Sequence, residues 1–211
     1  MNVPASPPQL EVFVVEDHLA VRKGLELLLR GEGIRVAGVA SSVPEARELM
    51  SRRRFDVALV DISLPGGSGV DLVRALLERD AQAAVVLYTG VTDPEQLREA
   101  SMAGARGFIL KASPPRELFE ALRRVAAGGT YVDPRLAEML TAGESIARLS
   151  VLTRRERQIL DLLAEGLTGE QVADQLFVSA ETVRTRIRNA TAKLGAKTRV
   201  QAVALVVRAQ S

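Results

Sequence analysis

Short aliphatic runs alternate with amphipathic segments over residues 10–129, and this alternation restricts the fold more than any other feature of the chain. Several runs are nearly continuous in Val, Ile and Leu, as is typical of parallel strands that are buried on both faces. Five strand–helix units in one stretch predict a doubly wound α/β domain with right-handed crossovers. The predicted strands are Leu10–Glu16, Ile34–Ala40, Asp56–Asp61, Ala84–Thr89 and Gly107–Leu110.

Residues typical of helix starts and helix ends lie between these runs. Ser42 followed by Glu45 is typical of a capping box, and Asp93-Pro94 begins another helix with proline at its first position. The last helix of this region is predicted over Pro114–Ala127, because Gly128-Gly129 follows it directly.

The rest of the chain has other patterns. Residues 1–9 contain three prolines and little that packs, which predicts a disordered tail. Residues 130–150 show no strand pattern and are interpreted as a linker, within which Pro134–Leu140 has the pattern of a short helix. Residues 151–211 are helical throughout and predict a small all-α domain of four helices. These helices are Arg154–Glu165, Gly169–Leu176, Ala180–Leu194 and Arg199–Arg208.

Composition excludes several classes of protein. The chain has no cysteine, so disulfides and thiolate metal sites are excluded. His18 is the only histidine, so a Ser-His-Asp triad and a histidine-based zinc site lack their parts. No apolar run approaches the ~20 residues that span a bilayer, and there is no signal-peptide pattern. We therefore expect a cytoplasmic protein without a membrane partner.

Charge is divided unequally along the chain. Residues 1–150 carry 18 Lys and Arg against 20 Asp and Glu, whereas residues 151–211 carry 10 against 6. From Thr182 onward there are seven basic residues and no acidic one. This pattern indicates polyanion binding by the C-terminal domain, although a solvated basic face would give the same counts.

Polar residues end four of the predicted strands. In sheets of this kind, ligands bind at the carboxyl ends of the strands, beside the point where strand order reverses. Converging carboxylates repel one another, and Mg²⁺ would relieve this repulsion while leaving room for a phosphate. A carboxylate nucleophile, a metal ion, a lysine and a hydroxyl are the groups that phosphoryl transfer to aspartate requires. The residues concerned are Glu16, Asp17, Asp61, Thr89 and Lys111.

Four segments, VFVVEDHLAVRKGL, VALVDISLPGGSG, VVLYTG and GARGFILKASPPREL, resemble the receiver domains of two-component response regulators in order and spacing. The resemblance covers nearly all of residues 10–129 and implies a flavodoxin-like, five-stranded parallel sheet. It implies that Asp61 accepts the phosphoryl group, and that Asp17, Asp61 and the backbone carbonyl of Ser63 hold Mg²⁺. It further implies that Glu16 acts on the metal through water, that Thr89 and Phe108 form the switch pair, and that Lys111 binds the phosphate.

The third predicted helix of the C-terminal domain has the pattern of a DNA-recognition helix. Ser179 is its predicted N-cap. Val183, Ile187, Ala190 and Leu194 form a single apolar stripe that must pack inward. The outward face would then suit a DNA major groove, with arginines that reach base edges or phosphates. The predicted outward residues are Glu181, Arg184, Thr185 and Arg188, with Arg186 and Lys193 on the flank toward phosphates.

Residues 152–207 resemble the LuxR-type helix-turn-helix of NarL/FixJ-class regulators. The features that carry the resemblance include Leu152-Thr153, Thr182-Val183-Arg184 and Lys193-Leu194-Gly195. Two departures stand out: Arg186 occupies a common histidine position, and Gly169-Glu170-Gln171 replaces Asn-Lys-Glu. Glu170 puts a negative charge where the family has a positive phosphate contact, which would weaken or redirect DNA binding.

The last predicted helix has apolar residues on two sides. Val200, Val203, Ala204 and Val207 form one stripe, and Ala202, Leu205 and Val206 lie roughly opposite. Because one stripe is enough to close a small core, the second stripe, which includes Leu205, predicts a homodimer interface that matches two half-sites on DNA. Contact with the receiver is the alternative.

Together these features imply a response regulator rather than an enzyme with an outside substrate. A sensor histidine kinase would phosphorylate Asp61, Thr89 would follow the phosphoryl oxygens, and Phe108 would turn inward. The change would free the recognition helix for promoter DNA, with RNA polymerase as a further partner. A metal-dependent phosphohydrolase is a rival, but the sequence shows no general acid or base beside Asp61. A regulator that works by partner binding without phosphorylation is the other rival.

Overall fold

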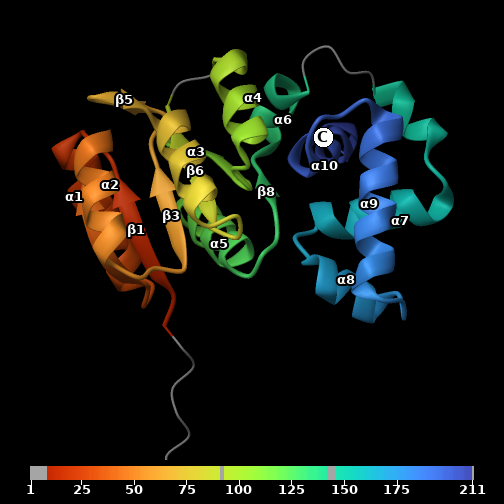
Figure 1. Ribbon diagram of the computed structural model, residues 1–211, viewed down its shortest axis with the longest axis horizontal. Coiled ribbons are helices and arrows are strands. Elements are labelled where there is room, and N and C mark those ends of the chain that lie inside the picture. The colour runs from red at the N-terminus through yellow and green to blue at the C-terminus, as the bar shows by residue number, and fades with distance from the viewer. Residues whose placement is uncertain (1–8, 91–92, 142–145, 211) are drawn as a thin grey trace, which may run out of the picture.

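The computed structural model describes residues 9–90, 93–141 and 146–210. Of the predicted disordered tail, residues 1–8 lie outside the described residues. The described chain forms an α/β domain followed by an all-helical domain, and the two lie side by side (Figure 1). Within the described ranges, none of the helices is long and apolar enough to cross a membrane.

A parallel sheet with the strand order β2-β1-β3-β6-β7-β8 forms the centre of the first domain. The order reverses at β1, so the crevice expected for a ligand lies beside the carboxyl ends of β1 and β3. A separate antiparallel pair, β4–β5, follows β3. The strands are β1 (Glu11–Val15), β2 (Arg35–Ala40), β3 (Val57–Val60), β4 (Ser63–Leu64), β5 (Gly67–Ser68), β6 (Val85–Thr89), β7 (Gly107–Leu110) and β8 (Tyr131–Val132).

Helices cover both faces of this sheet because successive strand residues point to opposite sides. Val12 and Val14 of β1 join a core with α1 and α5, whereas Phe13 and Val15 join a core with α2, α3 and α4. The helices of this domain are α1 (Leu19–Gly31), α2 (Val43–Arg52), α3 (Gly69–Arg79), α4 (Pro94–Ala103), α5 (Pro115–Ala126) and α6 (Pro134–Leu140).

The five predicted strands are confirmed, but the prediction of a five-stranded sheet is one strand short. The sixth strand, β8, pairs with β7 through Gly107–Tyr131 and Phe108–Val132. Two residues are too few to give an alternating pattern, which is why the sequence does not predict β8.

The first half of the predicted linker belongs to the α/β domain. The helix Pro134–Leu140 is confirmed as α6, and its residues Leu136, Ala137 and Leu140 are buried. The backbone N–H of Asp133 donates to the carbonyl of Phe108 at 2.9 Å and continues the sheet's hydrogen bonding. Residues 130–141 are therefore a packed extension of the α/β domain.

The two predicted helix starts, at Ser42 and Asp93, are both present, but the hydrogen bonds at Ser42 differ from a capping box. Asp93 caps α4, and its side chain accepts a hydrogen bond from the N–H of Glu95. Ser42 caps α2 as predicted, but the Glu45 side chain does not bind the backbone N–H of Ser42, as a capping box requires. The Glu45 carboxylate accepts from the N–H and hydroxyl of Ser41 instead.

The second domain packs four helices around one core. A 3-10 helix, η1 (Ile146–Val151), leads into it. Its helices are α7 (Arg154–Ala164), α8 (Gly169–Gln175), α9 (Ala180–Leu194) and α10 (Arg199–Gln210). Ser179 caps α9 by accepting from the N–H of Thr182 at 3.1 Å, as predicted.

The predicted exposed stripe on the last helix is not present in this structure. Every residue of α10 from Val200 to Val206 is buried. Ala202, Leu205 and Val206 join the helix-turn-helix core, whereas Val200 and Ala204 join the receiver core beside α6. Figure 1 shows α10 lying between the sheet edge and α9. The core of the helical domain therefore covers the Leu205 stripe that predicted a dimer, and the α/β domain covers the opposite stripe.

Candidate functional site

The predicted acidic pocket is assembled at the carboxyl ends of β1 and β3. Glu16 and Asp61 are almost fully buried, at 1% and 3% exposure, and Asp17 is partly exposed. One ligand atom from each of Glu16, Asp17, His18 and Asp61 lies within 4.8 Å of the others. The predicted proximity of Glu16, Asp17 and Asp61 is therefore confirmed.

Lys111 reaches this cluster from the end of β7. Its Nζ lies 2.6 Å from Glu16 Oε2 and 2.9 Å from Asp61 Oδ2. Burial alone would lower the pKa of Lys111, but its bonds to these two carboxylates outweigh burial and raise that pKa. The amino group therefore keeps its positive charge at neutral pH.

The donor set fits a hard divalent cation. Glu16 Oε2 and Asp17 Oδ1 are buried; beyond the ion pair of Glu16 with Lys111 and the contact of Asp17 with His18, neither atom has a hydrogen-bond partner among the described residues. Mg²⁺ prefers carboxylate, carbonyl and water oxygens, which Glu16, Asp17, Asp61 and the Ser63 backbone can offer.

His18 is the member of the cluster that the sequence analysis left out. Its Nδ1 lies 2.8 Å from Asp17 Oδ1 and 3.2 Å from Glu16 Oε1. Its position directly after the acidic pair was the available signal. The His18 side chain is exposed, and an imidazole is a poor ligand for Mg²⁺, so His18 is not among the groups that would hold the ion.

Backbone geometry holds Asp61 in place. Its Oδ1 accepts from the N–H of Ser63 at 3.3 Å, so the two carboxylate oxygens have different partners. A Cβ built on Gly69 would lie 2.1 Å from the Asp61 carbonyl oxygen. Only glycine allows the start of α3 to approach β3 this closely, which gives a reason for glycine at position 69.

An open hollow of about 640 Å³ lies beside this cluster. Asp17 and Ser63 line it together with Gln96 and Glu99 of α4, two residues that sequence reasoning did not single out.

The two predicted switch residues lie on neighbouring strands, with Thr89 opposite Leu110 and Phe108 opposite Leu87. Both are fully buried. The prediction that Phe108 turns inward requires an exposed ring before phosphorylation. In this structure the ring already lies in the core. That core also contains Val200 and Ala204 of α10, so Phe108 belongs to the cluster that joins the domains.

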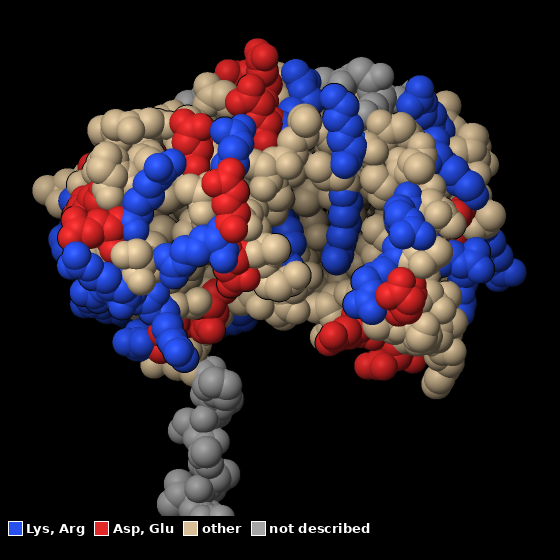
Figure 2. All heavy atoms as spheres, in the orientation of Figure 1, with Lys and Arg blue, Asp and Glu red and all other residues tan. Residues whose placement is uncertain are grey.

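The outward face of α9 is largely as predicted. Arg184 and Arg188 are exposed, and Arg184 forms a surface ion pair with Glu181 at 2.9 Å. Thr185, Arg186 and Ile187 are half-buried, so the inward stripe is less complete at Ile187 than predicted. Figure 2 shows Lys and Arg side chains gathered over α9 and along the seam between the domains, with acidic side chains over α8.

Lys193 has a partner inside the domain. Its amino group lies 2.7 Å from Oε2 of the buried Glu156. Glu156 also accepts from the N–H and hydroxyl of Thr153, which completes a capping box at the start of α7. In this structure Lys193 therefore ties α9 to α7, a role that its place in the sequence did not indicate.

Acidification should weaken the second domain through Glu156. Burial alone would raise its pKa, but bonds from Lys193 and Thr153 outweigh burial and lower that pKa. A lowered carboxyl pKa stabilises the fold above the ordinary value of about 4.3, and this contribution is lost as pH falls through the folded value. We expect Glu156→Gln to lower the melting temperature at neutral pH and to flatten its fall below about pH 4.3, measured by circular dichroism.

Glu181→Gln is the matched control, because it removes a carboxylate from an exposed ion pair on α9. Its melting temperature should follow that of the parent at every pH. Equal acid sensitivity of the parent and Glu156→Gln would refute the role given to Glu156.

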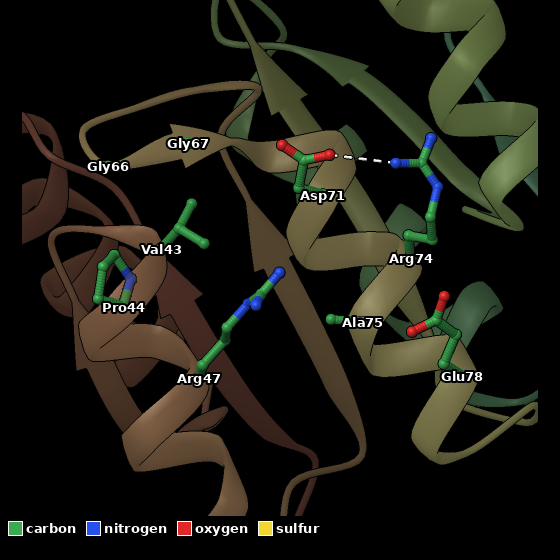
Figure 3. Close-up of a pocket in the computed structure, with 9 residues that line it drawn as sticks. All are labelled: Val43, Pro44, Arg47, Gly66, Gly67, Asp71, Arg74, Ala75 and Glu78. Atoms are coloured by element: carbon green, nitrogen blue, oxygen red, sulfur yellow. Dashed lines mark hydrogen bonds and ion pairs between the residues drawn. The ribbon is translucent and has the colours of Figure 1, made fainter.

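A second hollow, of about 440 Å³, lies between α2 and α3 (Figure 3). Arg47 extends between the two helices, and Asp71 and Arg74 pair at 3.1 Å on α3. None of the predicted site residues lines this hollow. It is separate from the acidic cluster.

Comparison with known proteins matches both halves of the chain. Residues 12–123 match the response regulator receiver domain, and residues 150–206 match the bacterial regulatory proteins of the luxR family. The DNA-binding transcriptional activator DevR/DosR of Mycobacterium tuberculosis (strain ATCC 25618 / H37Rv) is 39% identical over 92% of both chains. The nitrate/nitrite response regulator protein NarP of Escherichia coli (strain K12) is 36% identical over 96% of both chains.

Solved structures agree on the fold. The response regulator RcsB in its DNA complex aligns with a TM-score of 0.58 and 21% identity, covering 95% of this chain and 99% of that one. The proteins matched are DNA-binding transcription regulators rather than enzymes, which decides against the phosphohydrolase reading. The chain belongs to the two-component response regulators that join a receiver domain to a LuxR-type DNA-binding domain.

Proposed function

We propose that a sensor histidine kinase phosphorylates Asp61 and that this modification controls sequence-specific binding of promoter DNA by α9. The observation that carries the proposal is the environment of Asp61. One carboxylate oxygen faces Lys111, the other faces a backbone N–H, and two further carboxylates lie within reach. This arrangement suits a nucleophile that takes up a phosphoryl group beside a divalent cation.

In this proposal Asp17, Asp61 and the carbonyl of Ser63 hold Mg²⁺, with Glu16 acting through water. The ion would neutralise charge on the carboxylates and on the incoming phosphoryl group. Lys111 moves from its carboxylate partners to a phosphoryl oxygen, and the Thr89 hydroxyl donates to another. The test is acetyl-phosphate labelling with and without Mg²⁺, followed by a map of promoter binding by the labelled protein.

The route from Asp61 to the DNA-binding domain runs through Phe108. Its backbone carbonyl binds Asp133 at the start of α6, and its ring shares a core with α10. A shift of Thr89 toward the phosphoryl group would leave space beside Phe108, and repacking there would disturb the surface on which α10 rests. The proposed switch is therefore a change in how Phe108 packs.

We further propose that the chain binds DNA as a homodimer, as RcsB dimers do in a solved complex with DNA. The apolar residues Val200, Ala204 and Val207 meet the receiver core here. Separation of the domains would expose them for a second copy. Sedimentation of the phosphorylated and unphosphorylated protein tests this, because only the phosphorylated form should associate.

Substitution of the exposed arginines on α9 should weaken operator binding without unfolding the domain. We expect Arg188→Ala to cost about 1–3 kcal/mol of binding and to relax preference at one base pair, as for a base-reading arginine. Arg184→Ala should also weaken operator binding. Arg186→Ala should weaken all sequences alike and reduce the salt dependence by about one phosphate contact.

Arg47→Ala is the control, because Arg47 is an exposed arginine on α2 of the other domain. Fluorescence anisotropy with operator and scrambled DNA, over a range of salt concentrations, measures these effects. Wild-type binding by both Arg184→Ala and Arg188→Ala would show that α9 does not read the DNA.

A further inference from the structure

A polar bond joins α4 to the residue before α10, and an arginine follows that residue. Ser101 Oγ of α4 lies 2.7 Å from Thr198 Oγ1, and Ser101 is almost fully buried. Thr198 Oγ1 also accepts from the N–H of Gln201 at 3.2 Å, which caps the first turn of α10. The next residue, Arg199, begins α10.

Two donor atoms of Arg199 are buried without a hydrogen bond. Its Nε and Nη2 atoms are buried, and neither has a hydrogen-bond partner among the residues that the structure describes. Burial, with added repulsion from Arg106, lowers the pKa of Arg199 to about 10. Arg106 gives its own Nη2 to the carbonyls of Gln82 and Ala83. A buried guanidinium with unused donors is unfavourable unless a partner is supplied.

The same residue lines a basic hollow beside the recognition helix. This hollow has a volume of about 450 Å³, and Arg199 lines it with Arg184 and Arg188 of α9 and with Lys197 and Thr198. Four of its lining residues are cationic and none is acidic. Such a surface attracts a polyanion, and a guanidinium presents its donors in the geometry of a phosphate.

We propose that Arg199 is a ligand for a DNA backbone phosphate and that the closed domain interface withholds two of its donors, Nε and Nη2. When the receiver leaves α10, Nε and Nη2 are released at the edge of the hollow beside α9. There they bind the phosphate next to the bases that α9 reads. This inference rests on the proposed DNA binding by α9.

The withheld ligand couples domain separation to DNA binding. The closed form keeps Nε and Nη2 of Arg199 away from both water and anions, so the desolvation of these two donors opposes closure. DNA gives that group a partner only in the open form, and a ligand that prefers one state shifts the equilibrium toward it. Thr198 adds to this coupling, because its hydroxyl binds Ser101 in the closed form.

Arg199→Met tests the proposal in the full chain. The change removes the charge and keeps an unbranched side chain, so it relieves the closed interface while removing one phosphate contact. We expect affinity for all DNA sequences to fall several-fold, and the slope of log K against log salt to decrease in magnitude by about 0.9. A purely structural role for Arg199 would leave that slope unchanged.

Domain separation is measured in the same variants by energy transfer. Because the chain has no cysteine, dyes can be placed on Leu27→Cys of α1 and Glu170→Cys of α8, which are exposed positions. The phosphorylated Arg199→Met protein should show a smaller open fraction than the phosphorylated parent.

Ser101→Ala is the matched control, because it removes the bond to Thr198 and leaves every basic group in place. It should increase the open fraction and raise DNA affinity several-fold without changing the salt slope. The two variants thus move affinity in opposite directions, and only Arg199→Met changes the slope.

Three outcomes would overturn an assignment. If wild type binds DNA and Arg199→Met has the same affinity and slope, Arg199 is not a phosphate ligand, and the proposed function stands. If phosphorylated wild type binds no DNA, the proposed function itself fails. If inorganic phosphate opens the domains of wild type without DNA, at constant ionic strength, and Arg199→Met abolishes this, the ligand is a free anion instead of DNA.

Discussion

Replacement of Asp61 by Asn is expected to abolish phosphoryl uptake and leave the fold intact. The amide keeps the shape of the side chain and an oxygen that accepts from the N–H of Ser63, but it lacks the nucleophilic carboxylate. Lys111 keeps its ion pair with Glu16. Intact-mass measurement after treatment with acetyl phosphate and Mg²⁺ should show one added phosphoryl group on wild type and none on Asp61→Asn.

Asp71→Asn makes the same chemical change at a half-exposed position on α3, where Asp71 pairs with Arg74. This variant should be labelled like wild type. A phosphoryl adduct on Asp61→Asn would move the acceptor to another residue, and peptide mapping would identify it.

Leu205→Glu should unfold the second domain. Leu205 is fully buried in the helix-turn-helix core, so the variant loses the packing of a leucine and places a charge where the core offers no partner. We expect a loss of more than about 4 kcal/mol in the free energy of unfolding, measured by urea denaturation. The sequence had placed Leu205 on a strip between subunits, where this charge would have blocked dimers and spared the fold.

Ala209→Glu introduces the same charge at an exposed position of the same helix. It should change stability by no more than about 0.5 kcal/mol. A stable, folded Leu205→Glu protein that had lost only self-association would restore the original interpretation of that strip.

Features that depend on local chemistry were predictable from the sequence. The aliphatic runs predicted five strands. Because parallel strands end at one edge of the sheet, the positions of Asp61, Asp17 and Lys111 at strand ends predicted that they lie together. Ser179 and Asp93 were identifiable as caps, since a cap needs only its own side chain and the next few backbone amides.

Features that depend on distant partners were not predictable. The Lys193–Glu156 pair joins residues 37 positions apart, and nothing near either residue signals the other. The two apolar sides of α10 were visible, but a hydrophobic stripe does not specify what covers it. The strand β8 exists because β7 offers it an edge, so two residues with no pattern of their own become part of the sheet.

The hydrophobic cluster that contains both Phe108 and Ala204 bears on how the molecule melts. Because α10 contributes to the cores of both domains, neither core is complete without it, and the closed chain has no point at which its stability divides into two independent parts. Closed, it should unfold as a single cooperative unit. Once α10 leaves the receiver, each domain should unfold with its own enthalpy and at its own melting temperature. The switch therefore changes the number of cooperative unfolding units in the chain as well as their arrangement.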